Sequence, residues 1–351
     1  IRVVDASANR LEPPCPAFGR CGGCTWQYAA YERQLEWKRD VVVGQLAHLG
    51  RLENVDVRPT LAPGSPFTYR NRMDFAVLDG RPALHRHSSD RLVSLTGCLL
   101  LKPQLAGLFA GLGDLTGVRR VVLRAGVNTG DALILLEGRV PEQAPTWEAS
   151  VVVRSHAGLK TVRGRPWFEE EVDGARFQIP APSFFQVNTE GAGLLVALVG
   201  AAAGVTSEDV LLDGYAGVGL FAGTVGRTAR RVVTIDSSRA SFRAITRNLG
   251  ASIPGRFHSM LGGFEATSTA VEEPWDVAIV DPPRAGLGTA GVDAATRTAP
   301  RTIVLISCDP ASLARDARLL TAAAYRLDWV QPVDLFPQTY HVETVARFEL
   351  R

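Results

Sequence analysis

The sequence predicts an α/β protein in which a smaller, mainly antiparallel β domain precedes a doubly wound parallel sheet. Three patterns lead to this prediction. A cysteine-rich turn is followed by an amphipathic helix, short runs of alternating hydrophobicity fill the stretch up to Pro180, and beyond it buried-type strands alternate with helix-like segments. We therefore expect three parts, residues 1–59, 60–180 and 181–351.

Composition limits the classes of protein to which the chain can belong. Its 351 residues are 46% hydrophobic, so ordinary cores can form, and the longest apolar runs are too short or too interrupted to span a bilayer. The formal net charge of +2 neither requires nor excludes a nucleic-acid partner. Because no secretory signal segment is visible in the first residues, we expect a cytoplasmic protein. We also expect a monomer that does not enter a membrane.

Four cysteines have the pattern of metal ligands. Cys15, Cys21 and Cys24 form C-x5-C-x2-C in a turn of Gly, Pro and Arg, and Cys98 stands alone in LTGCLL. Ligation by thiolates alone suits zinc or an iron–sulfur cluster, and spacing does not choose between them. Structural zinc more often has two C-x2-C pairs, so the isolated fourth cysteine favours [4Fe-4S]. The alternative is a disulfide with unrelated buried cysteines, which is rare in the cytosol.

The stretch that follows the cysteine turn predicts an amphipathic helix. Apolar residues recur in it at helical spacing, and Gly50 supplies a stop. These apolar residues are Tyr31, Leu35, Val42, Leu46 and Leu49.

The central stretch predicts an antiparallel sheet built from hairpins. Its alternating runs are broken by Gly, Pro and Asp at short intervals, as hairpin turns require. The runs are FTYRNRMDFAVLDG, RRVVLRAGVNTGDALILLEG and SVVVRSHAGLKTVRG.

The last part predicts the doubly wound sheet and a ligand site at its edge. Its strands are VLLDG, RRVVTID, WDVAIVDPP and RTIVLISCD. The first strand leads into a glycine turn with Gly217 and Gly219, where the backbone can approach a ligand closely, and Asp236 ends the next strand, where it can accept from a ribose diol. Gly217-x-Gly219-x-x-Ala222 also satisfies the NAD fingerprint, and a third possibility is a glycine turn that only packs a helix.

The residues after the fourth strand argue against NAD. Asp281-Pro282-Pro283-Arg284 stands at the carboxyl edge of the sheet, and D-P-P after a strand is a mark of methyltransferases that use S-adenosylmethionine. The prolines form a rigid corner that holds Asp281 toward the site. Amino-group methyltransferases usually have an aromatic residue where Arg284 stands, so we expect the methyl acceptor to be a carbon.

Methylation at C5 of a pyrimidine needs one reactive thiol and one general base. A thiolate adds to C6, C5 takes the methyl group, and a base removes the C5 proton so that the thiolate can leave. Cys308 is the candidate nucleophile, and we expect the following helix N-terminus to lower its pKa. Glu343 in FPQTYHVETVARF is the candidate base. The alternatives are a buried, inert cysteine and a solvated glutamate.

Taken together, these motifs resemble the S-adenosylmethionine-dependent RNA uracil-5-methyltransferases, specifically the iron–sulfur branch that includes 23S ribosomal RNA enzymes. The resemblance rests on CPAFGRCGGCTWQYAAYERQLEWK, YRNRMDF, PAPSFFQVNT, LLDGYAGVGLF, DPPRAGL, SCDPASLARD and LFPQTYHVET, in family order. It implies a class I, Rossmann-like methyltransferase domain and a β domain that carries the cluster.

The resemblance also implies roles for individual residues. Cys308 would be the nucleophile and Glu343 the base. The cluster ligands would be Cys15, Cys21, Cys24 and Cys98, and the contacts to cofactor or target base would include Gln186, Tyr215, Asp236 and Asp281.

The chain departs from the family pattern at three places. Leu220 stands where relatives often have Asn or Thr, and no acidic residue is evident after the third strand, in FHSMLGGFEA, so no adenine-binding carboxylate is assigned. Members commonly carry a small RNA-binding β-barrel ahead of the cysteine turn, and we expect IRVVDAS to correspond to its last strand.

The expected partner is RNA, ribosomal or transfer. Residues 70–91 carry an excess of basic groups that can hold phosphates and unpaired bases, although a solvated sheet face would look the same. The basic residues are Arg70, Arg72, Arg81, Arg86 and Arg91, with His85 and His87, against Asp74, Asp79 and Asp90. Because C5 and C6 of a stacked uridine are shielded, we expect the base to be turned out of a loop or hairpin.

Two rival functions stay open. An RNA cytosine-5 methyltransferase would use the same thiolate addition. A non-catalytic RNA-binding protein could keep the cluster as a structural element, but binding alone requires neither Cys308 nor Glu343.

Overall fold

The computed structural model describes residues 3–139 and 147–351. The predicted amphipathic helix is confirmed as α1 (Tyr31–Gln45), which continues into a π-helical turn, η1 (Leu46–Gly50). Its buried face is partly polar, because Gln34 and Lys38 are fully buried beside Val42, whereas Leu49 is 43% exposed. The expected strand IRVVDAS begins in residues outside the described part, and its remainder, residues 3–7, forms no strand.

The central sheet has the strand order β3-β2-β1-β4-β5-β6-β7. Its elements are β1 (Arg72–Leu78), β2 (Arg81–His85), β3 (Leu92–Ser94), α2 (Pro103–Ala110), β4 (Val118–Ala125), β5 (Ala132–Gly138), β6 (Ser150–Ser155) and β7 (Gly158–Arg163). The three predicted hairpins are confirmed, and Asp79 and Gly80 turn the first of them with left-handed backbone angles. The mainly antiparallel prediction is confirmed, with β5 and β6 forming a parallel pair.

The second sheet has the order β12-β11-β10-β13-β14-β16-β15. Its strands are β10 (Val210–Gly214), β11 (Arg231–Asp236), β12 (Phe257–Leu261), β13 (Val277–Val280), β14 (Thr302–Ser307), β15 (Tyr325–Val333) and β16 (Glu343–Leu350). The first five strands of that order pair in parallel, and β16 and β15 add an antiparallel edge. The sheet order reverses at β10, so the ends of β10 and β13 meet where ligands of such sheets bind.

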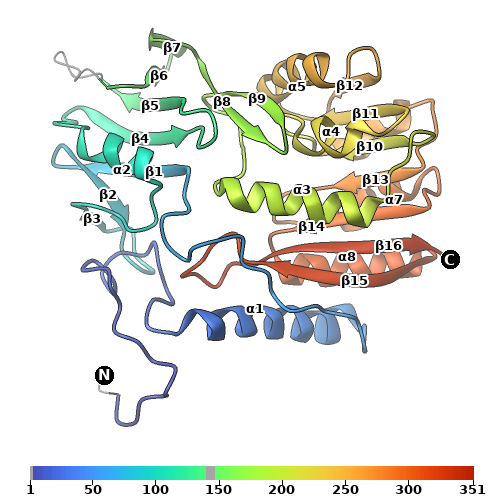
Figure 1. Cartoon of the computed structure of the whole chain (residues 1–351), viewed down its shortest axis with the longest axis horizontal. Helices are drawn as coiled ribbons and strands as arrows, with labels where there is room; N and C mark the ends of the chain where they lie inside the picture. The colour runs from blue at the N-terminus through green and yellow to red at the C-terminus, as the bar shows by residue number, and fades with distance from the viewer. Residues whose placement is uncertain (1–2, 140–146) are drawn as a thin grey trace.

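Helices cover both faces of this sheet, as a doubly wound fold requires (Figure 1). Leu211 packs in the core that holds α3, α4 and α5, whereas its neighbour Leu212 packs with α6, α7 and α8. The helical elements are α3 (Thr189–Ala203), α4 (Leu220–Gly223), η2 (Val225–Arg227), α5 (Arg239–Ser252), α6 (Phe264–Thr267), η3 (Ser268–Ala270), α7 (Gly288–Thr296) and α8 (Pro310–Ala322). This alternation explains why the strands are apolar on both faces.

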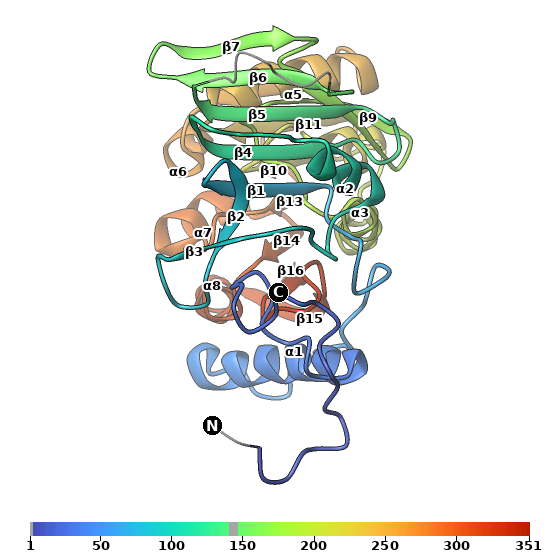
Figure 2. The same cartoon turned by 90° about the vertical axis from the view of Figure 1, so that its left-hand side faces the viewer.

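A short hairpin joins the two sheets. It consists of β8 (Trp167–Val172) and β9 (Ala175–Pro180), and its Phe168 and Phe177 share one core with strands of both sheets and with α5. Figure 2 shows the central sheet in front of the second sheet, with α1 running beneath both. The division of the chain at residues 59 and 180 stays a prediction, since this shared core crosses the second boundary.

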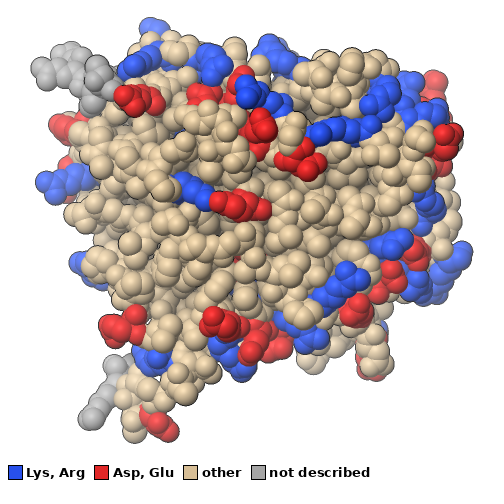
Figure 3. Space-filling view, viewed as in Figure 1, with Lys and Arg blue, Asp and Glu red and all other residues tan. Residues whose placement is uncertain are grey.

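None of the helices among the described residues is long and apolar enough to cross a membrane. Basic and acidic side chains are interspersed on the face drawn in Figure 3, as the small net charge leads one to expect.

Candidate active site

The predicted nucleophile and base line one cavity, which we call the reaction cavity. Cys308 follows the end of β14, Glu343 begins β16, and the antiparallel register that pairs Ser307 with Thr344 sets the two side by side. The reaction cavity measures about 460 Å³. It is lined by Phe184, Gln186, Tyr215, Asp281, Pro282, Pro283, Arg284, Cys308, Phe336, His341 and Glu343.

The thiol of Cys308 is protonated at neutral pH in the free protein. Its pKa is raised to about 11, first by burial and then by the nearby Glu343, while the Arg284 guanidinium acts to lower it. The prediction that the helix N-terminus lowers this pKa is therefore wrong. The physical reason is that burial of the thiol outweighs the groups that lower its pKa; at the helix end itself, Asp309, the N-cap of α8, accepts from the Ser312 N–H at 2.9 Å.

The two carboxyl groups in the reaction cavity are poised to hold protons. Burial raises the pKa of Glu343 well above its ordinary value, Asp281 raises it further, and Arg284 lowers it. Burial also raises the pKa of Asp281 to about 7. A carboxyl group with such a raised pKa is a competent general base at neutral or mildly alkaline pH.

A second, smaller cavity adjoins the reaction cavity, and we call it the donor cavity. The two share Phe184, Gln186, Tyr215 and Asp281. The donor cavity extends along the glycine turn after β10, where Gly219 has φ +90° and a Cβ would lie 2.7 Å from Ile245. This turn therefore requires glycine, and it lets main chain line the cavity.

The acids of β10 and β11 flank this turn. Asp236 accepts from the Gly217 N–H at 2.8 Å and from the Ser238 N–H at 2.8 Å, and burial raises its pKa. Asp213 is buried and accepts from the Ala222 N–H, while its Oδ1 has no partner within the described part of the chain. Burial raises the pKa of Asp213 to about 8.

Residues 334–341, between β15 and β16, form a loop that places His341 and Phe336 in the reaction cavity. Side chains of α1 hold this loop through hydrogen bonds. Lys38 donates to Asp334 at 2.5 Å and to the Phe336 carbonyl at 3.2 Å. Gln34 and Gln338 exchange hydrogen bonds at 3.1 and 3.2 Å. The buried polar face of α1 thus holds this loop in place.

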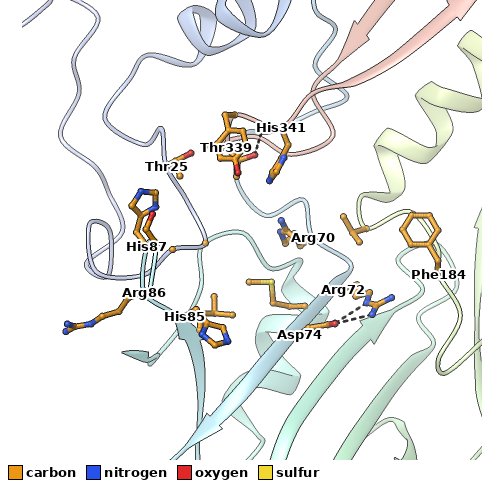
Figure 4. Close-up of a pocket in the computed structure, with 17 residues that line it drawn as sticks. Thr25, Arg70, Arg72, Asp74, His85, Arg86, His87, Phe184, Thr339 and His341 are labelled. Atoms are coloured by element: carbon orange, nitrogen blue, oxygen red, sulfur yellow. Dashed lines mark hydrogen bonds and ion pairs between the residues drawn. The ribbon is translucent and has the colours of Figure 1, made fainter. Parts of the chain in front are cut away.

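A larger groove opens next to the reaction cavity and shares Phe184 and His341 with it (Figure 4). Its basic and imidazole side chains are Arg70, Arg72, His85, Arg86, His87 and His341. Asp74 also lines the groove and is ion-paired with Arg72 and Arg120. Of the basic residues expected to contact RNA, Arg81 and Arg91 do not line this groove.

The four predicted metal ligands surround one small cavity. Cys15, Cys21 and Cys24 reach it from the N-terminal segment and Cys98 from the loop after β3. Cys21 forms an isolated antiparallel β-bridge with Arg86, and this backbone pairing connects the N-terminal segment to the end of β2. All five cysteines are free thiols, so the disulfide alternative is not realised. Within the described residues, no group of three His, Cys, Asp or Glu side chains could hold a metal ion as it stands.

Comparison with known proteins assigns the family. Residues 264–349 match the family model described as tRNA (Uracil-5-)-methyltransferase. An uncharacterized RNA methyltransferase of Gloeobacter violaceus is 33% identical over 390 residues, which cover 99% of this chain and 85% of that protein. The chain belongs to the RNA (uracil-5-)-methyltransferase family. A further relative, an RNA methyltransferase of Streptomyces avermitilis, is 32% identical over 99% of the chain and 86% of its own length.

A solved structure extends the likeness to the fold. Pyrococcus abyssi tRNA (uracil-54, C5)-methyltransferase, in complex with S-adenosyl-L-homocysteine, superposes with a TM-score of 0.78. The two proteins are 26% identical, and the match covers 99% of this chain and 88% of that one. The predicted family and the Rossmann-like methyltransferase domain are confirmed, whereas the iron–sulfur branch and the RNA substrate stay predictions.

Three residues of this uracil-5-methyltransferase site were not singled out from the sequence as site residues. They are Phe184, Arg284 and His341. Phe184 is 59% exposed and lines both cavities and the groove. Arg284 donates to Nδ1 of His341 at 3.3 Å, and desolvation lowers the pKa of His341 to about 4, so the imidazole is neutral. All three lie within or beside motifs quoted for Gln186, Asp281 and Glu343, so adjacency to those residues was the available signal.

Proposed function

We propose that this methyltransferase transfers a methyl group to C5 of a uridine in RNA through a covalent bond between Cys308 and C6. The observation that carries the proposal is the shared reaction cavity, in which a thiol and a carboxyl group stand side by side at the edge of a methyltransferase sheet. The membership of the uracil-5 family supports C5 of uridine over the cytosine alternative.

The proposed steps balance around these two residues. Cys308 loses its proton and its Sγ bonds to C6, and the Arg284 guanidinium favours the thiolate that this step needs. C5 then takes the methyl group. Glu343 in its ionised form removes the C5 proton, and the electron pair of that C–H bond expels Sγ from C6. The proton that Cys308 gave up goes to solvent, and Glu343 passes the C5 proton to the expelled thiolate, so that the thiol and the carboxylate are both regenerated.

We place S-adenosylmethionine, which supplies the methyl group, at the donor cavity, because this cavity lies between the glycine turn and the reaction cavity. Gly217 and its neighbours in the glycine turn line this cavity, so main chain can approach a ligand closely there. We assign Asp236 to the ribose diol, and Gln186, Tyr215 and Asp281 to the end of the cofactor that faces the reaction cavity. The S-adenosyl-L-homocysteine bound to the Pyrococcus abyssi enzyme supports S-adenosylmethionine as the cofactor.

We further propose that the four cysteines Cys15, Cys21, Cys24 and Cys98 hold a [4Fe-4S] cluster. The thiols surround one cavity, yet they are not arranged as the ligands of one ion. A cubane has separate iron atoms for its separate thiolates, so its ligands need not converge on one point. The position of all four cysteines around one cavity supports the proposal, and the isolated fourth cysteine in the sequence favours a cluster over zinc.

RNA is proposed to occupy the groove next to the reaction cavity. Arginine and histidine side chains line it, and a base turned out of a loop could pass from the groove into the reaction cavity where the two share Phe184 and His341. Ribosomal RNA is the substrate we propose, with transfer RNA as the alternative that the Pyrococcus abyssi relative favours.

The test combines mapping and trapping. Mapping of 5-methyluridine in total RNA, with and without the gene, identifies the uridine, and labelled methyl transfer to uridine-containing and cytidine-containing transcripts separates the uracil from the cytosine reaction. Glu343→Gln should accumulate a methylated RNA adduct that survives denaturing electrophoresis, and the double variant with Cys308→Ala should lose it. Turnover of Glu343→Gln at the wild-type rate would refute the role of this base, and binding without methylation would favour a non-catalytic protein.

A further inference from the structure

Tyr340 is an exposed aromatic side chain at the mouth of the reaction cavity, and the chemistry proposed above does not use it. It is 59% exposed and lines the groove but not the reaction cavity. A large aromatic ring held in water forgoes the favourable burial of its apolar surface. Such a ring at a ligand groove is therefore a candidate contact.

The backbone that carries Tyr340 is held on both sides. Gln338 has a left-handed φ of 68°, and its carbonyl accepts from the N–H groups of Thr25 and Trp26 at 2.9 and 3.0 Å. The Thr339 hydroxyl donates to the Phe336 carbonyl at 2.7 Å and accepts from the His341 N–H at 3.3 Å. The ring thus projects from a fixed loop, so little ordering entropy is lost when it meets a ligand.

The surroundings of Tyr340 match an unpaired nucleotide. Its ring lies 4.3 Å from the neutral imidazole of His341, at an interplanar angle of 43°. Thr339 and His341 project from this loop toward the hollow that Arg70 and Arg72 line from the other side (Figure 4). Aromatic rings stack on bases of any sequence, and nearby arginines neutralise the phosphates.

We propose that Tyr340 stacks on the base of a nucleotide adjacent to the methylated uridine and so selects an RNA whose target lies in an unpaired loop. This inference rests on the proposed function, because the uridine in the reaction cavity fixes which nucleotides remain in the groove. Since the two spaces meet at Phe184 and His341, the neighbour of a base inside the reaction cavity would meet the ring next to His341 on the groove side, which is that of Tyr340.

The test is a double-mutant cycle that combines removal of the Tyr340 side chain with removal of one base from the RNA. The probe is a fluorescein-labelled RNA hairpin whose loop carries the mapped uridine, made intact and with either adjacent nucleotide abasic. Tyr340→Ala should raise the Kd and KM for the intact hairpin by about five-fold to 100-fold, as the loss of one stacked base does, while kcat at saturating RNA stays near wild type. Tyr340→Phe should behave like wild type. Leu159→Ala, which removes an exposed apolar side chain from β7, is the matched control and should change nothing.

The abasic hairpins decide between stacking and mere loop structure. On the hairpin that lacks the stacked base, wild type and Tyr340→Ala should bind equally. An equal Kd for both proteins on the intact hairpin, or the same penalty on every hairpin, would overturn the inference. Binding and methylation are measured separately. If the Kd values follow the expected pattern but no methyl group is transferred, the result would contradict the proposed function and still support stacking by Tyr340.

Discussion

At the residue scale, the reactivity of Cys308 depends on two charged neighbours that act in opposite directions. Glu343 raises the pKa of the thiol and Arg284 lowers it, on top of the larger effect of burial. A buried thiol that stays protonated until substrate arrives is protected from oxidation and from stray electrophiles, because the thiolate is the reactive form. The site then has to generate the thiolate at the moment of attack, and Arg284 is the cation available for it.

Substitution of either neighbour should move this pKa in a known direction. Below its pKa of about 11, alkylation of Cys308 by iodoacetamide should speed up as the pH rises, because only the thiolate reacts. Glu343→Gln should lower the pKa and speed up alkylation at a given pH, whereas Arg284→Gln should raise the pKa and slow it down. Peptide mass spectrometry reads Cys308 separately from the other cysteines, which serve as internal references. Identical profiles for the two variants would contradict this electrostatic picture.

The ribose carboxylate gives a second prediction at this scale. Asp236→Ala removes the proposed charged acceptor of the ribose diol and should weaken S-adenosylmethionine binding by about 1.5–3 kcal/mol. Because Asp236 also accepts from the Gly217 N–H, the variant Asp236→Asn, which keeps one acceptor oxygen, should lose less. Isothermal titration measures both, with NADH as the control ligand. Tight NADH binding that no methyl donor displaces would restore the NAD interpretation of the glycine turn.

Site residues could be predicted from the sequence where a motif gives a reactive atom a fixed place along the chain. Cys308, Asp281 and Gln186 follow strands or precede a helix, so their place at the sheet edge follows from the fold, and all of them line the reaction cavity. The pKa of Cys308 could not be predicted in the same way. It depends first on burial and then on the nearby Glu343 and Arg284, and these are visible only once the strands and loops around the thiol are folded.

At the element scale, α1 has a role that its sequence did not reveal. Its apolar spacing predicted the helix correctly, but the residues that matter for the site are Gln34 and Lys38. Their partners on the 334–341 loop lie 304 and 296 positions away in the chain. Periodicity describes one helix at a time, so a pairing across such a separation is outside its reach. The hairpins of the central sheet were predictable because strand, turn and strand are contiguous.

Removal of either α1 side chain should loosen the loop. Lys38→Met leaves Asp334 buried without its cation and should lower the free energy of unfolding by about 3–5 kcal/mol. Gln34→Ala removes the hydrogen bonds that Gln34 makes to Oε1 and to the backbone N–H of Gln338, and it should lower the free energy of unfolding by about 1–3 kcal/mol. Urea unfolding measures the stability, and hydrogen exchange of residues 334–341 measures the loop.

Arg33→Ala is the matched control for these α1 variants. Arg33 forms an exposed ion pair with Glu36, so the substitution should change the unfolding free energy by less than about 1 kcal/mol. Gln34→Ala should also lower kcat for methylation while the affinity for S-adenosylmethionine is kept, because the donor cavity does not touch the loop. Unchanged hydrogen exchange of the loop in Gln34→Ala would show that α1 does not hold it.

At the scale of the whole molecule, the N-terminal segment connects the cysteine cavity to the reaction cavity. Gly22 donates to the His85 carbonyl at 2.9 Å on the central sheet, and a few residues later Thr25 and Trp26 donate to Gln338 beside the active site. Between residues 11 and 20 the segment has turns but no helix or strand. A metal centre that binds Cys15, Cys21 and Cys24 together with Cys98 would fasten it to the sheet.

The proposed cluster therefore has a structural consequence that can be measured without an activity assay. Protein purified without oxygen should be brown and contain about four iron and four sulfide per chain, as a cubane requires. Cys98→Ser should reduce the iron content and raise hydrogen exchange in residues 15–26, and the effect should extend to Gln338, because Thr25 and Trp26 bond to it directly. Cys308→Ser, which alters a cysteine outside this set, should keep its full complement of iron. Stoichiometric zinc without sulfide in the anaerobic protein would refute the cluster. Iron loss that leaves exchange in the N-terminal segment unchanged would show that the metal does not fasten it.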